Sequence, residues 1–113
     1  MPKYLISFDE GSMTFPDEDL PAVDAAAHAV VREAKAAGVW VFGGGVDYGV
    51  PTSVVATDGS VTDGPLPEGI ERIGGVTIID APTREVALEW AAKIAVACRC
   101  AQEVREFMFD PES

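Results

Sequence analysis

The sequence predicts an α+β fold, with two helices on one face of an antiparallel sheet. Two segments, 21–37 and 84–97, carry apolar residues at helical spacing, and short stretches rich in β-formers lie before, between and after them. The order is strand, helix, strand, hairpin, strand, helix, strand. A chain of 113 residues has the usual size of one domain, so we expect a single domain over residues 1–113.

The first part of the chain is predicted to form a strand, a helix and a second strand. Residues 3–8 are rich in β-formers, and Pro21 suits the first turn of the alanine-rich helix 21–37. The segment 39–42 is apolar on both faces, so this strand should be central in the sheet or lie at an interface. The glycine run 43–45 is expected to end it.

Turn signals dominate the middle of the chain. A strand over 52–57 leads into the Asp-Gly pair at 58–59, which is typical of a two-residue hairpin turn with positive φ. The return strand begins at 60–62, and the Asp-Gly-Pro run at 63–65 turns the chain again.

The last part is predicted to form a strand, a helix and a final strand. The apolar run within 74–80 indicates the strand. Thr83 is placed as the N-cap of the helix 84–97, with Glu85 favourable in its first turn. Residues 102–109 are predicted to form the final strand, in which the side chains of Val104, Glu106 and Met108 alternate with those of Arg105, Phe107 and Phe109.

The charge and hydropathy of the chain exclude several classes of protein. The net charge of -11, from 19 acidic and 8 basic residues, repels phosphate backbones and argues against a nucleic-acid partner. No apolar run approaches the roughly 20 residues that cross a membrane. The first residues lack the pattern of a signal peptide, so we expect a cytoplasmic protein in a reducing environment.

The two cysteines, Cys98 and Cys100, are the remaining candidates for metal or redox chemistry. Residues two apart on a strand are too constrained for a good disulfide, and two thiols with one histidine cannot complete a structural zinc site. We therefore expect free and mostly inert thiols, with a site shared across a dimer as the alternative. No metal and no cofactor is implied.

Two helices on one sheet face leave the opposite face bare, and that face carries apolar side chains. An exposed apolar sheet face usually marks a partner or a pocket. A homodimer that closes two such faces together is the economical expectation.

The motifs from residue 52 onward resemble a known family. Thr-Asp-Gly-Pro at 62–65 resembles the signature of the DGPF proteins, within the YCII-related group. The matches that follow it in the family's order are Glu68 and Glu71, Gly-Gly at 74–75, Ala-Leu-Glu-Trp-Ala-Ala at 87–92 and Glu-Val-Arg at 103–105. The resemblance covers residues 52–108 well and residues 3–51 loosely.

This resemblance implies a ferredoxin-like subunit that pairs as a dimeric α+β barrel. Most members have no established activity, some are thought to use a His–Asp pair beside a pocket, and some are associated with sigma-factor systems. The chain departs from the family pattern at two positions, with Leu66 where Phe is usual and Ile70 where Lys is usual. The second change removes a cation that could have held an anionic ligand.

His28 and Asp9 are the candidate catalytic pair. His28 is the only histidine, the side chain that titrates nearest neutrality, and the resemblance also places a histidine on the first helix. It would act as a general base oriented by Asp9 at the end of the first strand. The alternative is a histidine at the edge of the apolar stripe, paired with Asp24 four residues earlier.

Two charged residues are candidate substrate ligands. Asp63 could act as a pocket carboxylate or could cap its own turn. Arg105 could hold a carboxylate in a forked contact, or it could neutralise Glu71 or Glu103.

The aromatic residues Trp40 and Tyr48 could line a ligand pocket or belong to the core. The glycine-rich run does not have dinucleotide or phosphate-loop spacing, and no hydrolase elbow is present. The sequence therefore favours a dimeric small-molecule-binding protein or a small cofactor-independent enzyme using a His–Asp pair. The alternative is a non-catalytic binding or regulatory module, such as one that belongs to a sigma-factor-linked system.

Overall fold

The structure is a computed structural model that describes residues 1–64 and 72–113. Its elements are β1 (Lys3–Asp9), a short 3-10 helix η1 (Asp17–Asp19), α1 (Leu20–Ala36), β2 (Trp40–Gly45), β3 (Ser53–Val55), β4 (Val61–Asp63), β5 (Ile73–Asp80), α2 (Arg84–Cys98) and β6 (Glu103–Glu106). None of the described helices combines the length and the apolar character needed to cross a membrane.

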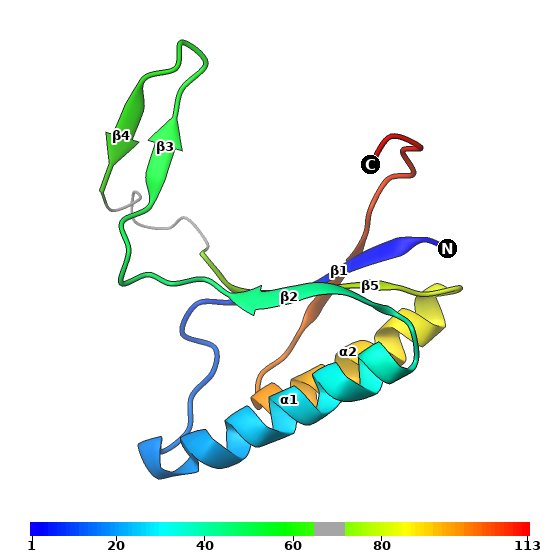
Figure 1. The fold of residues 1–113 in the computed structure, drawn as a ribbon. Helices are drawn as coiled ribbons and strands as arrows, with labels where there is room; N and C mark the ends of the chain where they lie inside the picture. The colour runs from blue at the N-terminus through cyan, green and yellow to red at the C-terminus, as the bar shows by residue number, and fades with distance from the viewer. Residues whose placement is uncertain (65–71) are drawn as a thin grey trace.

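Four strands form one antiparallel sheet in the order β2-β5-β1-β6. Both helices cover one face of this sheet, and the opposite face is open (Figure 1). The strands β3 and β4 pair only with each other, as a separate hairpin that stands away from the sheet. The α+β, ferredoxin-like fold predicted from the sequence is confirmed.

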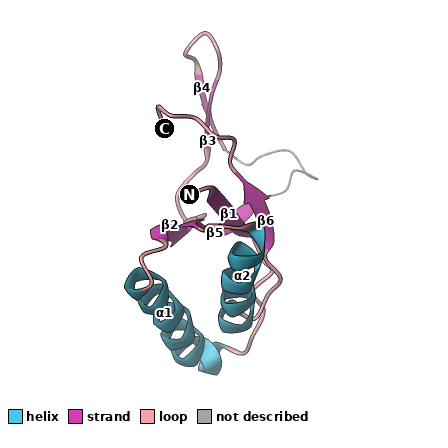
Figure 2. Cartoon of the chain, turned by 90° about the vertical axis from the view of Figure 1, so that its right-hand side faces the viewer, coloured by secondary structure: helices cyan, strands magenta, loops and turns pink. Residues whose placement is uncertain are grey.

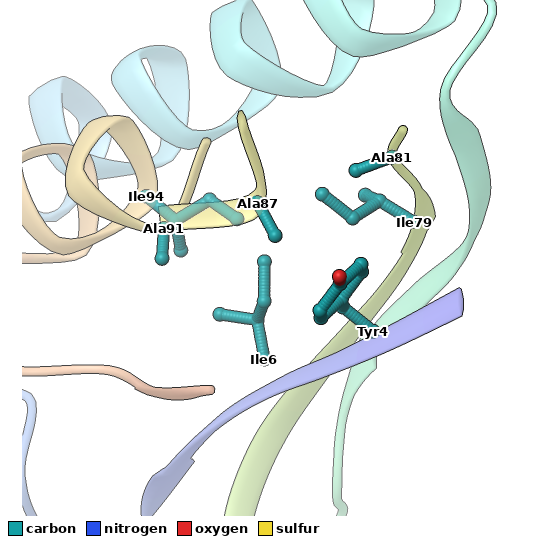
Figure 3. Close-up of a cluster of buried hydrophobic side chains, with 7 residues drawn as sticks. All are labelled: Tyr4, Ile6, Ile79, Ala81, Ala87, Ala91 and Ile94. Atoms are coloured by element: carbon teal, nitrogen blue, oxygen red, sulfur yellow. The ribbon is translucent and has the colours of Figure 1, made fainter. Parts of the chain in front are cut away.

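The core lies between β1, β5 and α2. Side chains alternate along β1, so Tyr4 and Ile6 both point toward the helices and are almost fully buried. Alanines on α2, Ala87 and Ala91, face them and let the helix approach the sheet closely (Figure 3). The alanines of α2 thus allow close packing on the sheet and also favour the helix itself.

Strand β2 differs from its prediction in two respects. It lies at the edge of the sheet, which rules out the central position but leaves the predicted alternative, a place at an interface, untouched. It also continues through the glycines, with Gly43 paired to Thr77 and Gly45 to Gly75. The Trp40 ring lies over Gly43, where a Cβ atom would collide with the indole. Glycine is therefore required here for close approach of an aromatic ring, not as a strand terminator.

The final strand is shorter than predicted. Pairing with β1 ends at Tyr4 and Glu106, and the last link is the Phe107 amide, which donates to the Lys3 carbonyl over 2.9 Å. Residues 107–113 leave the sheet after this bond, despite their alternating pattern. They rise on the side opposite the helices (Figure 2).

Helix α2 begins where the sequence predicts. Thr83 has extended backbone, and its Oγ1 accepts a hydrogen bond from the Val86 amide at 3.2 Å. Glu85 lies in the first turn, where a carboxylate favours the helix dipole. The helix ends at Arg99, whose backbone adopts the left-handed conformation with φ of 57°.

Replacing Thr83 by alanine is expected to lower the free energy of unfolding by about 1 kcal/mol, because the Val86 amide loses its partner. Urea unfolding followed by circular dichroism measures the change. Thr83→Ser keeps the hydroxyl and should stay close to the parent protein. An alanine variant as stable as the serine variant would show that the cap contributes nothing.

Candidate functional site

The open face of the sheet carries one continuous row of side chains. Leu5 alternates with the core residues Tyr4 and Ile6 and therefore points away from the helices. Strand pairing extends this row across all four strands, through Arg105, Leu5, Ile78 and Phe42. Three of the four are apolar, and Phe42 is 57% exposed. The face predicted to be bare and apolar is present.

A trough lies on this face, at the end of the sheet where β1 begins. It has a volume of about 650 Å³ and is lined mainly by apolar side chains. We define the trough by its apolar residues, Val41, Ile78, Phe107, Met108 and Phe109, with Lys3 and Glu106 among its polar ones. The volume falls within the roughly 300–1,000 Å³ typical of small-molecule sites.

The wall of the trough is the C-terminal segment, which begins at Phe107. Because the segment departs from the sheet after its bond to the Lys3 carbonyl, its aromatic residues stand over the open face instead of extending β6. The Lys3 ammonium lies 2.6 Å from the Asp80 carboxylate, so its charge is already paired. The trough thus combines an apolar floor and wall with few charges.

A second group of polar residues gathers at the opposite end of the sheet. Arg72 lies 3.6 Å from the Glu10 carboxylate and 5.4 Å from the centre of the Tyr48 ring. The Tyr48 hydroxyl donates to the Ile73 carbonyl over 2.8 Å. Asp9 lies beside this group, at the register shift where β1 leaves β5.

The predicted residues Asp9 and Tyr48 are therefore brought to the same end of the sheet. Sequence reasoning missed Arg72, which holds both Glu10 and Tyr48. The available signal was its position, as a cation directly before the strand that pairs with β1. Because the Tyr48 hydroxyl and the Arg72 guanidinium both bind groups of the chain itself, this group mainly stabilises the sheet end.

His28 lies on the exposed side of α1. Its Nδ1 is 3.4 Å from the Asp24 carboxylate, and its side chain is 60% exposed. Ala27, one residue earlier, is half-buried, and a step of one residue turns His28 about 100° away from that side of the helix. Within the described part of one chain, the predicted contact with Asp9 is not formed, and the i,i+4 partner Asp24 is the arrangement found.

Arg105 and Asp63 bind neighbouring side chains. The Arg105 guanidinium lies 2.7 Å from the Glu103 carboxylate on the exposed edge strand. This is the alternative in which Arg105 neutralises a neighbouring acid. Asp63 belongs to β4, and its carboxylate accepts a hydrogen bond from the Ser53 hydroxyl across the hairpin. It thus ties the two strands of the hairpin together.

Trp40 packs against its own strand, over Gly43, with the Lys35 ammonium 5.9 Å from its ring centre. It is half-buried on the helix side of the sheet and does not line the trough. The sequence features at Leu66, Glu68, Ile70 and Glu71 lie outside the described residues.

Both cysteines are free thiols that are half-buried. Burial raises the pKa of Cys98 above its usual value, and the neighbouring Cys100 adds to this effect. Burial also raises the pKa of Cys100, although the hydrogen bond that its sulfur accepts from Gln102 acts in the opposite direction. Among the described residues, no group of three or more potential ligands is arranged to hold a metal ion.

Alkylation of Cys98 and Cys100 by iodoacetamide is expected to be slow at neutral pH. A raised thiol pKa leaves less thiolate at any given pH, and the thiolate is the nucleophile. The labelling rate, followed by mass spectrometry, should keep rising at pH values where an exposed cysteine has levelled off. Cys98→Ser and Cys100→Ser separate the two sites, and labelling as fast as in the urea-unfolded chain would contradict the prediction.

Comparison with known proteins gives a family and a structural neighbour. A family model described as the YCII-related domain matches residues 4–108. A solved structure of 5-chloro-2-hydroxyhydroquinone dehydrochlorinase from Burkholderia phenoliruptrix AC1100, in complex with 2,5-dihydroxybenzoquinone, is similar in fold, with a TM-score of 0.53. It is 16% identical, and the match covers 99% of this chain and 98% of that one. Curated proteins give no match.

Proposed function

Because the chain belongs to the YCII-related domain family, we propose that it is a homodimeric small-molecule-binding protein whose ligand lies in the trough on the open sheet face. The observation that carries this proposal is the juxtaposition of the apolar row on the open face with a cavity of about 650 Å³. Pairing two open faces would enclose both troughs between the subunits, as in a dimeric α+β barrel.

The lining of the trough indicates the class of ligand. Apolar surfaces from Ile78, Val41 and the aromatic residues of the C-terminal segment suit a flat, largely apolar ring. The Lys3 ammonium is already paired with Asp80, so the lining offers few free charges for polar substituents. The structural neighbour is complexed with 2,5-dihydroxybenzoquinone, a flat ring that carries four oxygen atoms, which supports the choice of a planar ring.

Binding without chemistry is the better-supported form of this proposal. Acid–base catalysis by His28 would require a partner that orients it, and its neighbour in the chain is the exposed Asp24 rather than Asp9. A cofactor-independent reaction using His28 and Asp9 is the alternative. We place the protein in the cytoplasm, where a reducing environment would keep its two free thiols reduced.

A thermal-shift screen of substituted hydroquinones, benzoquinones and aromatic acids tests the ligand class. A ligand at about 100 times its Kd adds roughly 2.7 kcal/mol to the stability, which raises Tm by several degrees. Val41→Asp places a charge in the trough and should remove the shift. Val96→Asp introduces the same charge on the helix side of the sheet, in the groove between α1 and α2, and should keep the shift.

A shift that survives Val41→Asp would move the ligand out of the trough. No saturable shift with any of the three compound classes would contradict the proposed ligand class. If a compound binds, following it by absorbance and NMR during incubation distinguishes binding from turnover, and loss of turnover in His28→Gln would support the catalytic alternative.

A further inference from the structure

The hairpin formed by β3 and β4 stands apart from the other helices and strands that the structure describes. All residues from 53 to 63 are exposed, and among the described elements the hairpin packs substantially only against itself. An isolated two-stranded hairpin is at best marginally stable in water. The hairpin would therefore be stabilised by packing against a further surface, which the described part of one chain does not provide.

The shape of the chain supports the same conclusion. Its radius of gyration is 15.9 Å, and its extents are 45 × 42 × 21 Å. A compact domain of about this length has a radius of gyration of roughly 13 Å. The excess comes from the hairpin and the C-terminal segment, which both stand on the side of the sheet opposite the helices (Figures 1 and 2).

One face of the hairpin is apolar. Val55 and Val61 are direct cross-strand partners, so their side chains lie on the same face, and they are 65% and 60% exposed. Val54 pairs with Thr62 on the opposite face. The hairpin thus offers a valine pair on one side and a mixed surface on the other.

The hairpin and the trough lie at opposite ends of the open face. The hairpin connects to the sheet after β2 and before the first residue of β5, Ile73, whereas the trough contains Ile78 near the end of β5. In Figure 1 the hairpin accordingly rises at one end of the sheet and the C-terminal segment at the other. A two-fold rotation that places two open faces together exchanges these ends when its axis runs across the strands, and this is the arrangement that the proposal requires.

We propose that each hairpin reaches across the dimer and lays Val55 and Val61 over the partner's trough, so that every ligand cavity is completed by the other subunit. This inference rests on the homodimer proposed above. The contact has to be apolar, because two chains of net charge -11 repel each other. The valine pair meets this requirement, and the trough provides the matching apolar surface.

Photo-crosslinking tests the contact directly. Val55→p-benzoylphenylalanine is prepared in unlabelled protein and mixed, after unfolding and refolding, with 15N-labelled protein of parent sequence. We expect adducts that join unlabelled to labelled chains and map to Val41 or to Phe107–Phe109. The same probe at Val54, on the other face of the hairpin, should give several-fold fewer such adducts.

Dimer affinity gives a second measurement. Val55→Asp should raise the dimer dissociation constant by about tenfold or more, because its carboxylate would be buried without a partner. Val54→Asp should have a clearly smaller effect. Both variants should keep the parent far-UV circular dichroism, since the hairpin is exposed in each chain.

The outcomes separate this inference from the proposed function. A parent protein that sediments as a monomer overturns both the homodimer and the exchanged hairpin. A dimer whose adducts stay within one chain, or lie elsewhere on the partner, overturns the hairpin contact alone. Equal effects of Val54→Asp and Val55→Asp on the dissociation constant also overturn it.

Discussion

Replacing Phe42 by aspartate is expected to turn a dimer of twice the 11.9 kDa chain mass into a monomer. Phe42 lies in the apolar row of the open face and is 57% exposed in a single chain. In a face-to-face dimer both copies would be buried, and losing each one costs about 1.5–3 kcal/mol of apolar burial. A total of about 3 kcal/mol or more corresponds to at least roughly a hundredfold weaker dimer.

Sedimentation velocity over a range of concentrations measures this change. Val96→Asp, on the helix side of the sheet in the groove between α1 and α2, is the matched control and should leave the dimer intact. Each single chain should tolerate either substitution, because both side chains are exposed there. A Phe42→Asp protein that remains as tightly paired as Val96→Asp would show that the open face is not the interface.

Replacing Ile6 by alanine is expected to destabilise the chain strongly. Ile6 is 0% exposed and faces the alanines Ala87 and Ala91 of α2, which are too small to fill the space it would leave. Such a change costs about 2–5 kcal/mol, out of a total stability of roughly 5–15 kcal/mol. The free energy of unfolding should fall accordingly.

The neighbouring residue Leu5 supplies the control. It lies on the same strand but on the open face, so Leu5→Ala should cost much less within one chain. Urea unfolding of both variants in the Phe42→Asp background separates chain stability from association. Equal losses of unfolding free energy for Leu5→Ala and Ile6→Ala would mean that the two side chains are buried alike, which would contradict the assignment of the β1 faces.

Local sequence patterns predicted most of the helices and turns of this chain. The helices over 21–37 and 84–97 are found within one residue of their predicted ends, with Thr83 as the N-cap of the second. The Asp-Gly pair at 58–59 turns a hairpin as predicted, but the loop has three residues, 57–59, instead of two, and the positive φ of 87° is at Gly59 and not at Asp58. These features depend on residues at most a few positions apart, so their spacing alone specifies them.

Contacts between distant residues decided the candidate site. The alternating pattern continues to residue 109, but the pairing with β1 stops at Glu106, and the aromatic tail beyond it forms a trough wall. His28 has Asp24 rather than Asp9 beside it, because one helical residue changes the direction of a side chain by about 100°.

The sequence by itself determined the fold class, the helix ends, the hairpin turn and the family motifs, because each of these is a local pattern of residue types. Only the tertiary structure decided which strand lies at the edge, which groups meet, and that an apolar hairpin and an apolar trough stand at opposite ends of one open face. The physical reason is that strand order and register are set by pairing between β1, β2, β5 and β6, whose residues are far apart in the chain.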